Sequence, residues 1–385
     1  MKSLPPFAPK LLAAAVALAL PVGAAWADIK IGFNVPSTGF AAADGKSALD
    51  GAKLAVAEAN AKGGIAGEKL ELVVYDDQAS PKEAVPAVTK MIEKDKVVVG
   101  VSGSYSGSTR AAASIFQKAQ VPYVVAYAIH PDITLAGDYM FRVSAMGEVQ
   151  GRGGAKLVQN LGKKNVVVIT VKNDFGQSLA AGFKEGASEL SLKIINEYEY
   201  GMADRQFGPL VSKVKADNPE VIYASGYYFN AGPLVSQLRA AGVTVPIIGQ
   251  EGYDSEKFVD IAGPASEGTL ITTSLDRDSD STVTQTFLAN FRKATGVGAD
   301  MVAASSYTAT SVAIEGLRKT GGKGGEALKN ALASGTYDTP IGKLAFNDLH
   351  EVQKNLQVQI VKDKAFHRHS VISDAVLLAP PSKPK

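Results

Sequence analysis

Apolar and polar positions follow one another along the chain in a pattern that predicts short buried strands, each followed by an amphipathic helix. Residues 29–34 form a short, mainly apolar run, and turn residues follow at 36–39. Between residues 47 and 60 the apolar positions make a broad helical stripe, which Gly63 and Gly64 end. The pattern predicts a strand, a turn and a helix in this order.

The same succession continues and is then repeated in a second half of the chain. Strands are predicted at 70–75 and 97–101, with a helix between them that Pro81 opens. The β-branched run at 97–101 is typical of a strand with both faces covered. The second half is predicted to hold strands at 166–171, 192–198, 221–224 and 245–249, with helices at 175–190, 206–217 and 231–241. Two such arrays predict an α/β fold of two doubly wound lobes.

The first 27 residues have the pattern of an export signal. Lys2 and Lys10 give a positive start, and residues 11–20 form an apolar run that is too short to span a bilayer. Ala25 and Ala27 then supply the small-x-small pattern of a cleavage site. We expect residues 1–27 to be a cleaved signal peptide; the alternative is an N-terminal membrane anchor.

Composition indicates the compartment and excludes several partners. The chain has no cysteine, so it can form no disulfide and carries no cysteine for a lipid anchor. Two of its 40 basic residues and none of its 38 acidic residues lie in the export signal, so residues 28–385 have no formal net charge. No later segment has the length and polarity of a transmembrane helix. We therefore expect a free periplasmic protein without nucleic acid or a membrane surface as partner.

The loops at the carboxyl ends of the predicted strands are the candidate site, because ligands of doubly wound sheets bind there. After strand 97–101 comes the run SGSYSGST, residues 102–109, followed by a helical pattern. Hydroxyls and backbone N–H groups at a helix start can hold a carboxylate or a phosphate. The alternative is an ordinary helix cap with glycines for turn geometry.

Two later loops carry an acid and a phenol. Tyr227 follows strand 221–224, and Glu251 follows strand 245–249. A carboxylate and an aromatic face at neighbouring strand ends can together hold an ammonium group. Opposite an anion site they would complete a clamp for a zwitterion; the alternative is a solvated glutamate and half-buried tyrosines.

No catalytic or metal-binding constellation stands out in the sequence. The segment GSYSG would suit a serine hydrolase, but Tyr105 stands where the nucleophilic serine should be. Of the four histidines only His367 and His369 have a spacing that a metal site could use, and this pair lies near a polar C-terminal end, where we expect it to be solvated. We predict a protein that is no enzyme and needs neither metal nor cofactor, with a secreted hydrolase as the alternative.

Several passages together resemble one family, the periplasmic branched-chain amino acid (Leu/Ile/Val) binding proteins of type I ABC transporters. They are ANAKGGIAGEKLELVVYDD at 59–77, SPKEAVPAVTKMI at 80–92, FRVSAMGEVQG at 141–151, NDFGQSLAAGF at 173–183 and GQEG at 249–252. The resemblance covers almost all of the chain after the signal. It implies two lobes joined by three hinge crossovers, a small-molecule ligand closed between them, and delivery to the membrane subunits of an ABC permease. We expect a monomer.

The resemblance also implies domain boundaries and site residues. The N-terminal lobe would comprise 28–146 and 275–352, and the C-terminal lobe 147–274 and 353–385. Ser106 falls where the family uses a serine hydroxyl for the ligand carboxylate. Tyr127 falls where a backbone carbonyl accepts the ligand ammonium group, and Tyr227 and Glu251 fall where an aromatic residue and an acid hold that same group.

Three positions depart from the family pattern. Ile129 stands where threonine or serine commonly bonds the carboxylate, Phe175 where tyrosine is frequent, and Asp44 where tryptophan or tyrosine packs against the ligand side chain. An amino acid remains the expected ligand, but an amide, a urea-like compound, an aromatic acid or a polar amino acid are alternatives, as is a sensory role. Asp44 either faces the variable end of the ligand or points to solvent at the cleft rim.

Overall fold

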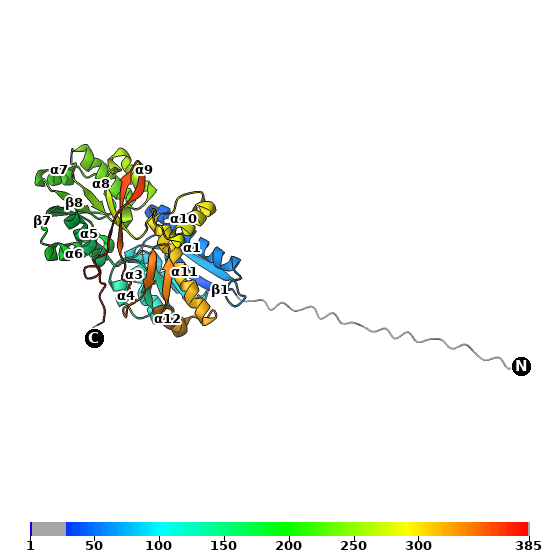
Figure 1. Ribbon diagram of the computed structural model, residues 1–385. Helices are drawn as coiled ribbons and strands as arrows, with labels where there is room; N and C mark the ends of the chain where they lie inside the picture. The colour runs from blue at the N-terminus through cyan, green and yellow to red at the C-terminus, as the bar shows by residue number, and fades with distance from the viewer. Residues whose placement is uncertain (2–27, 384–385) are drawn as a thin grey trace.

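A computed structural model describes Met1 and residues 28–383, which form two α/β lobes (Figure 1). Residues 2–27, which hold nearly all of the predicted export signal, lie outside the described part. In Figure 1 the blue and cyan elements make one lobe together with the yellow and orange helices, and the green elements make the other. Within the described residues no helix is long and apolar enough to cross a membrane.

The sheet of the first lobe is parallel throughout, with strand order β2, β1, β3, β4, β5. Its strands are β1 (Ile29–Val35), β2 (Leu70–Asp76), β3 (Val99–Ser102), β4 (Tyr123–Val125) and β5 (Met140–Arg142). β3 is buried along its whole length, as expected for a parallel strand covered on both faces. The strand order reverses next to β1, and the loops after β1 and β3 therefore open at a topological switch point.

The sheet of the second lobe has the order β14, β13, β10, β9, β8, β6, β7. Its parallel strands are β6 (Asn165–Val171), β7 (Lys193–Tyr200), β8 (Val221–Ala224), β9 (Ile247–Gly249) and β10 (Leu270–Thr273). Two antiparallel strands, β13 (Leu356–Lys362) and β14 (Ala365–Ile372), complete it. A separate hairpin consists of β11 (Thr336–Thr339) and β12 (Gly342–Ala345).

Helices cover both sheets. The first lobe contains α1 (Ala42–Ala61), α2 (Pro81–Glu93), α3 (Ser106–Ala119), α4 (Asp132–Leu135), α10 (Thr282–Thr295), α11 (Met301–Thr320) and α12 (Gly325–Ala333). The second contains α5 (Gly147–Asn160), α6 (Asp174–Glu189), α7 (Gly208–Asp217), α8 (Tyr228–Ala240) and α9 (Glu256–Ala262). Helix α11 packs closely on α1, because a Cβ built on Gly51 would lie 2.3 Å from the carbonyl oxygen of Ala303. The late helices thus return to the first lobe.

The chain passes between the lobes three times, after β5, after β10 and after β12. The predicted fold class, two doubly wound lobes joined by three crossovers, is confirmed. These three connections comprise residues 143–146, 274–281 and 346–355.

Helix α1 begins five residues earlier than the sequence pattern predicts. Its N-cap residue, Ala41, makes no side-chain capping bond, and the helix continues directly from a 3₁₀ turn, Gly39–Ala41. No capping residue therefore marks its start in the sequence. As a consequence, Asp44 lies in the first turn of a helix and not in a loop.

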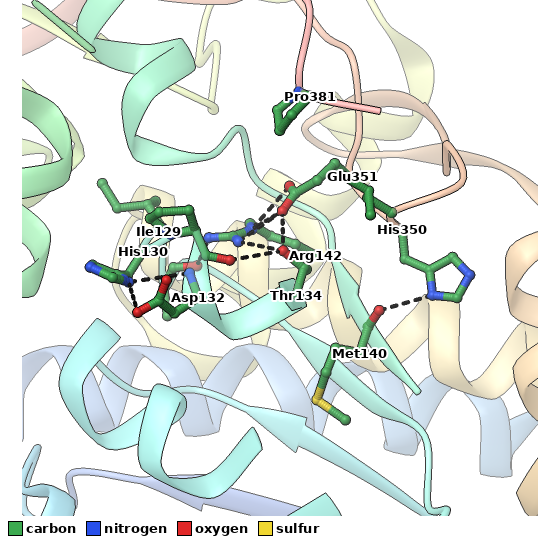
Figure 2. A network of polar contacts seen from close by, with 12 residues as sticks. Ile129, His130, Asp132, Thr134, Met140, Arg142, His350, Glu351 and Pro381 are labelled. Atoms are coloured by element: carbon green, nitrogen blue, oxygen red, sulfur yellow. Dashed lines mark hydrogen bonds and ion pairs between the residues drawn. The ribbon is translucent and has the colours of Figure 1, made fainter. Parts of the chain in front are cut away.

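A buried ion pair links two of the three crossovers (Figure 2). Arg142, the last residue of β5, donates from Nη2 to Oε1 of Glu351 at 2.8 Å, and its Nε lies 3.1 Å from Oε2. Both residues are buried, and Thr134 completes the network through its hydroxyl. Glu351 lies in the third crossover, so the pair holds the first and third connections together.

Candidate functional site

A cavity lies between the lobes, beside the carboxyl ends of the central strands. Its position, and not its size, makes it the candidate site, because ligands of doubly wound sheets bind at the carboxyl ends of the strands. Its walls are formed by Asp44, Tyr105, Ser106, Tyr127, Phe175, Tyr227, Glu251, Gly252, Asp254, Ser255, Met301 and Val302. Six of the seven residues predicted from the sequence are among them. Ile129 is the exception, and it reaches the site only through its backbone.

The start of α3 offers hydrogen-bond donors to the cavity. Ser106 is the first residue of the helix, and Tyr105 at the N-cap makes no side-chain capping bond. Within the described residues, the backbone N–H groups of Ser106 and Gly107 have no hydrogen-bond acceptor. Unpaired N–H groups and the helix dipole favour an anion at this end.

The hydroxyls of the run 102–109 do not all point to one spot, contrary to the sequence prediction. Ser102 pairs with Thr109 at 2.7 Å, and Ser104 pairs with Ser108 at 2.8 Å, all in buried positions. These four hydroxyls hold the turn and have no access to the cavity. The serine that remains for a ligand is Ser106, whose Oγ accepts from Ile129 N at 3.1 Å and so keeps its own proton for donation.

One peptide unit, between Ala128 and Ile129, connects the cavity with the hinge ion pair. The N–H of Ile129 donates to Ser106 Oγ, while the carbonyl of Ala128 accepts from Arg142 Nη1 at 3.0 Å. The C=O and the N–H of a trans peptide point in opposite directions, so the guanidinium fixes the direction of the N–H in the cleft. The backbone carbonyl of Tyr127, one residue earlier, accepts no hydrogen bond from the described residues. The phenol of the Tyr127 side chain donates to Gly103 O at 2.5 Å.

Glu251 supplies a buried carboxylate on the opposite lobe. It begins a 3₁₀ turn, Glu251–Tyr253, directly after β9 and is 2% exposed. Ser274 Oγ donates to its Oε1 at 2.5 Å and Gln150 Nε2 to its Oε2 at 3.0 Å. Burial raises the pKa of Glu251. Burial also lowers the pKa of Lys354 to about 8, although the charge of Glu251 acts to raise it. The two donors fix the carboxylate in a place where a cation would be favoured.

Aromatic rings from both lobes meet across the cavity. The rings of Tyr105 and Tyr227 stack with centroids 4.4 Å apart and an angle of 20° between their planes. Phe175 lies on the same side, 4.8 Å from Tyr227, whose hydroxyl accepts from Asn173 Nδ2 at 3.1 Å. Stacking between residues 105 and 227 joins the lobes, so the structure has a closed cleft at this point.

Asp44 faces the cavity and not the solvent. It is 5% exposed, and its Oδ2 accepts from the Tyr105 hydroxyl at 2.6 Å. Burial raises the pKa of Asp44 to about 7, the Tyr105 bond lowers it, and the charge of Asp300 raises it further. The alternative, that Asp44 points to solvent at the cleft rim, is therefore wrong.

One wall of the cavity comes from residues that the sequence pattern did not indicate. Met301 and Val302 begin α11, far along the chain from the other lining residues. The missed acid, Asp254, is paired with Arg277 at 2.5 Å and with Thr273 at 2.6 Å. A signal for α11 does exist, since Asp300 precedes an apolar helical run and caps it by accepting from Ala303 N at 2.8 Å.

Comparisons with known proteins agree on one family. The family model described as periplasmic binding protein matches residues 28–365. A leucine-, isoleucine-, valine-, threonine- and alanine-binding protein of Pseudomonas aeruginosa is 30% identical over 325 residues, which cover 83% of this chain and 86% of that protein.

Solved structures show the same fold. The branched-chain amino acid transporter substrate-binding protein LivJ from Streptococcus pneumoniae, in complex with isoleucine, is 27% identical with a TM-score of 0.84, over 90% of this chain and 99% of that chain. A solute-binding protein of an ABC transporter from R. palustris, in complex with benzoate, has a TM-score of 0.81 over 91% of this chain and 99% of that chain. At 22% identity it is similar in fold alone.

Proposed function

Because the chain belongs to the periplasmic binding protein family, we propose that it is the solute-binding component of an ABC importer and binds an amino acid between its lobes. One observation carries this proposal. Donors at the start of α3 and the buried Glu251 carboxylate line the same cavity from opposite lobes. Such an arrangement is complementary to a zwitterion.

The proposed mechanism is non-catalytic closure about the three crossovers. The lobes would be 28–146 with 275–352, and 147–274 with 353–385, as expected from the sequence. A ligand that contacts both lobes stabilises the closed state by its differential affinity for it. The stacking of Tyr105 on Tyr227 and the ion pair between Arg110 Nε and Asp174 at 3.1 Å would form only on closure.

The roles of the residues follow from their donors and acceptors. The Ser106 hydroxyl and the N–H groups of α3 would bind the ligand carboxylate. The Tyr127 carbonyl, the Tyr227 ring and Glu251 would bind its ammonium group. Ile129 would act through its N–H, which orients Ser106, and Phe175 would supply apolar surface.

Ser106→Ala is expected to weaken amino acid binding by roughly 10- to 150-fold, since a hydrogen bond to a charged group contributes about 1.5 to 3 kcal/mol. Isothermal titration calorimetry measures this change. Ser114→Ala, an exposed position on the same helix, is the matched control and should bind as the wild type does. Equal affinities of the two variants would contradict the role of Ser106.

We also propose that the protein works in the periplasm as a monomer, without a lipid anchor, and delivers its ligand to the permease. The family and the predicted export signal support this location. Genes for permease and ATPase subunits beside its own would support transport, whereas a membrane receptor gene in that place would favour the sensory role.

A screen by thermal shift tests the proposed function. A ligand that binds only the folded state raises the unfolding midpoint by mass action. We expect the largest shifts among α-amino acids. If an amide, a urea-like compound or an aromatic acid gave the largest shift, the receptor role would stand but the amino acid assignment would be contradicted. These compounds belong in the screen because Asp44, a polar residue, lines the cavity.

A further inference from the structure

The variable end of the cavity carries an acid that no base neutralises. Asp44, Glu251 and Asp254 line the cavity, and none of the described lining residues is Lys, Arg or His. Asp254 is paired with Arg277, and the positive charge of Lys354 lowers the pKa of Glu251 against the effect of burial. No salt bridge reaches Asp44 within the described residues, where it makes one side-chain hydrogen bond, to Tyr105.

We propose that Asp44 is a specificity residue and that the ligand is an α-amino acid whose side chain ends in a cationic nitrogen. This inference rests on the proposed function, since it assigns the side-chain end of the same ligand. Asp44 comes from α1 of the first lobe and Glu251 from the second, so the two acids lie in opposite walls. A head group bound at Glu251 therefore leaves Asp44 for a different part of the ligand.

One carboxylate oxygen of Asp44 has no hydrogen-bond donor among the described residues. Oδ2 accepts from Tyr105, and Oδ1 accepts no hydrogen bond from the described residues. Asp44 is 5% exposed as a residue, so little solvent reaches its carboxylate. An aliphatic ligand would leave the oxygen without a donor in a closed cleft, which is costly for a buried polar atom. An ammonium or guanidinium group would supply the donor together with the missing charge.

The aromatic walls suit the same group. The stacked rings of Tyr105 and Tyr227 line the cavity beside Asp44. Aromatic faces attract cations, and more strongly where water is excluded. The family pattern has a large aromatic side chain at the position of Asp44. In this chain the position is an acid, and the aromatic surface comes from the neighbouring Tyr105 and Tyr227.

The charge state of Asp44 links ligand binding to pH. Burial raises its pKa to about 7, and a bound cation would lower it again. The titratable groups that face Asp44 are Tyr105, Tyr127, Tyr227, Tyr228 and Asp300. Burial raises the pKa of all four tyrosines far above 7, that of Tyr228 to about 12, so the tyrosines remain neutral. Asp300, with a pKa of about 6, adds a second negative charge, which also favours a cation.

Ornithine and norleucine test the proposal as a matched pair, because they differ mainly in a terminal ammonium group against a terminal methyl group. Calorimetric titration of the purified protein at pH 8 should give at least about tenfold tighter binding of ornithine. That preference should shrink at pH 6, where Asp44 is protonated. Equal binding of both ligands, or tighter binding of norleucine, would overturn the inference.

Asp44→Asn supplies the second arm of the test. It keeps an acceptor for Tyr105 but has no charge, so the preference for ornithine should fall to about one. Asp50→Asn, which changes an acid paired with Lys46 on the same helix, should keep the wild-type preference. A retained preference in Asp44→Asn would overturn the assignment of this residue.

The two levels of proposal fail in different ways. If both ligands bind equally to the wild type and both are lost in Glu251→Gln, amino acid binding stands and the inference on Asp44 is wrong. If neither ligand binds and the Glu251 variant behaves as the wild type does in the wider screen, the proposed function itself is wrong.

Discussion

Glu251→Gln is expected to weaken amino acid binding by about 2 to 5 kcal/mol, or roughly 30- to 5,000-fold. The ligand ammonium group would then lie buried against a neutral amide, and most of the cost comes from that unpaired charge. Glu251→Ala, which also removes the acceptor, should leave no measurable binding. Calorimetric titration of each variant gives the affinity.

Neither change should harm the fold. Burial raises the pKa of Glu251 in the folded state, so folding disfavours its charge, and a neutral glutamine at this position avoids that cost. Glutamine can still bond Ser274 and Gln150. Glu256→Gln, an exposed acid a few residues along the chain, is the matched control. Wild-type affinity in Glu251→Gln would refute the clamp.

Arg142→Met is expected to lower the free energy of unfolding by about 3 to 5 kcal/mol, because it leaves the Glu351 carboxylate buried without its partner. Removing both members, in Arg142→Met with Glu351→Leu, should recover much of the loss, since no uncompensated charge remains. Thermal unfolding followed by calorimetry compares the three proteins.

The surface pair Lys184 and Glu197 provides the contrast. Its atoms lie 3.1 Å apart, but both side chains are about half exposed, so Lys184→Met should change stability by no more than about 0.5 kcal/mol. If Arg142→Met were equally mild, the hinge ion pair would not hold the two crossovers together.

The strands and the family were open to prediction because their signals are local. Runs of β-branched residues mark buried parallel strands, and loops at their carboxyl ends mark the candidate site, so the loops that contain Ser106, Tyr227 and Glu251 were predicted from their positions, and these three residues line the cavity. Within its loop, Ser106 was singled out by the family resemblance. The start of α1 was missed because no capping side chain marks it.

Other features depended on tertiary contacts. The sequence does not tell which hydroxyls of the run 102–109 turn inward. In the structure Ser106 is the serine of this run that lines the cavity, beside Tyr105. Met301 reaches the site from a helix about two hundred residues after Tyr105 in the chain. The burial of Asp44 likewise follows from helix α1 packing against the residues before α3 and α11, which no local pattern encodes.

The position of a bound amino acid in a crystal structure of the complex tests the central claim most directly. We predict the ligand carboxylate at the start of α3 beside Ser106, and the ammonium group between the Tyr127 carbonyl, Tyr227 and Glu251. A ligand bound outside the cavity between the lobes, or one with its ammonium group away from Glu251, would contradict the claim.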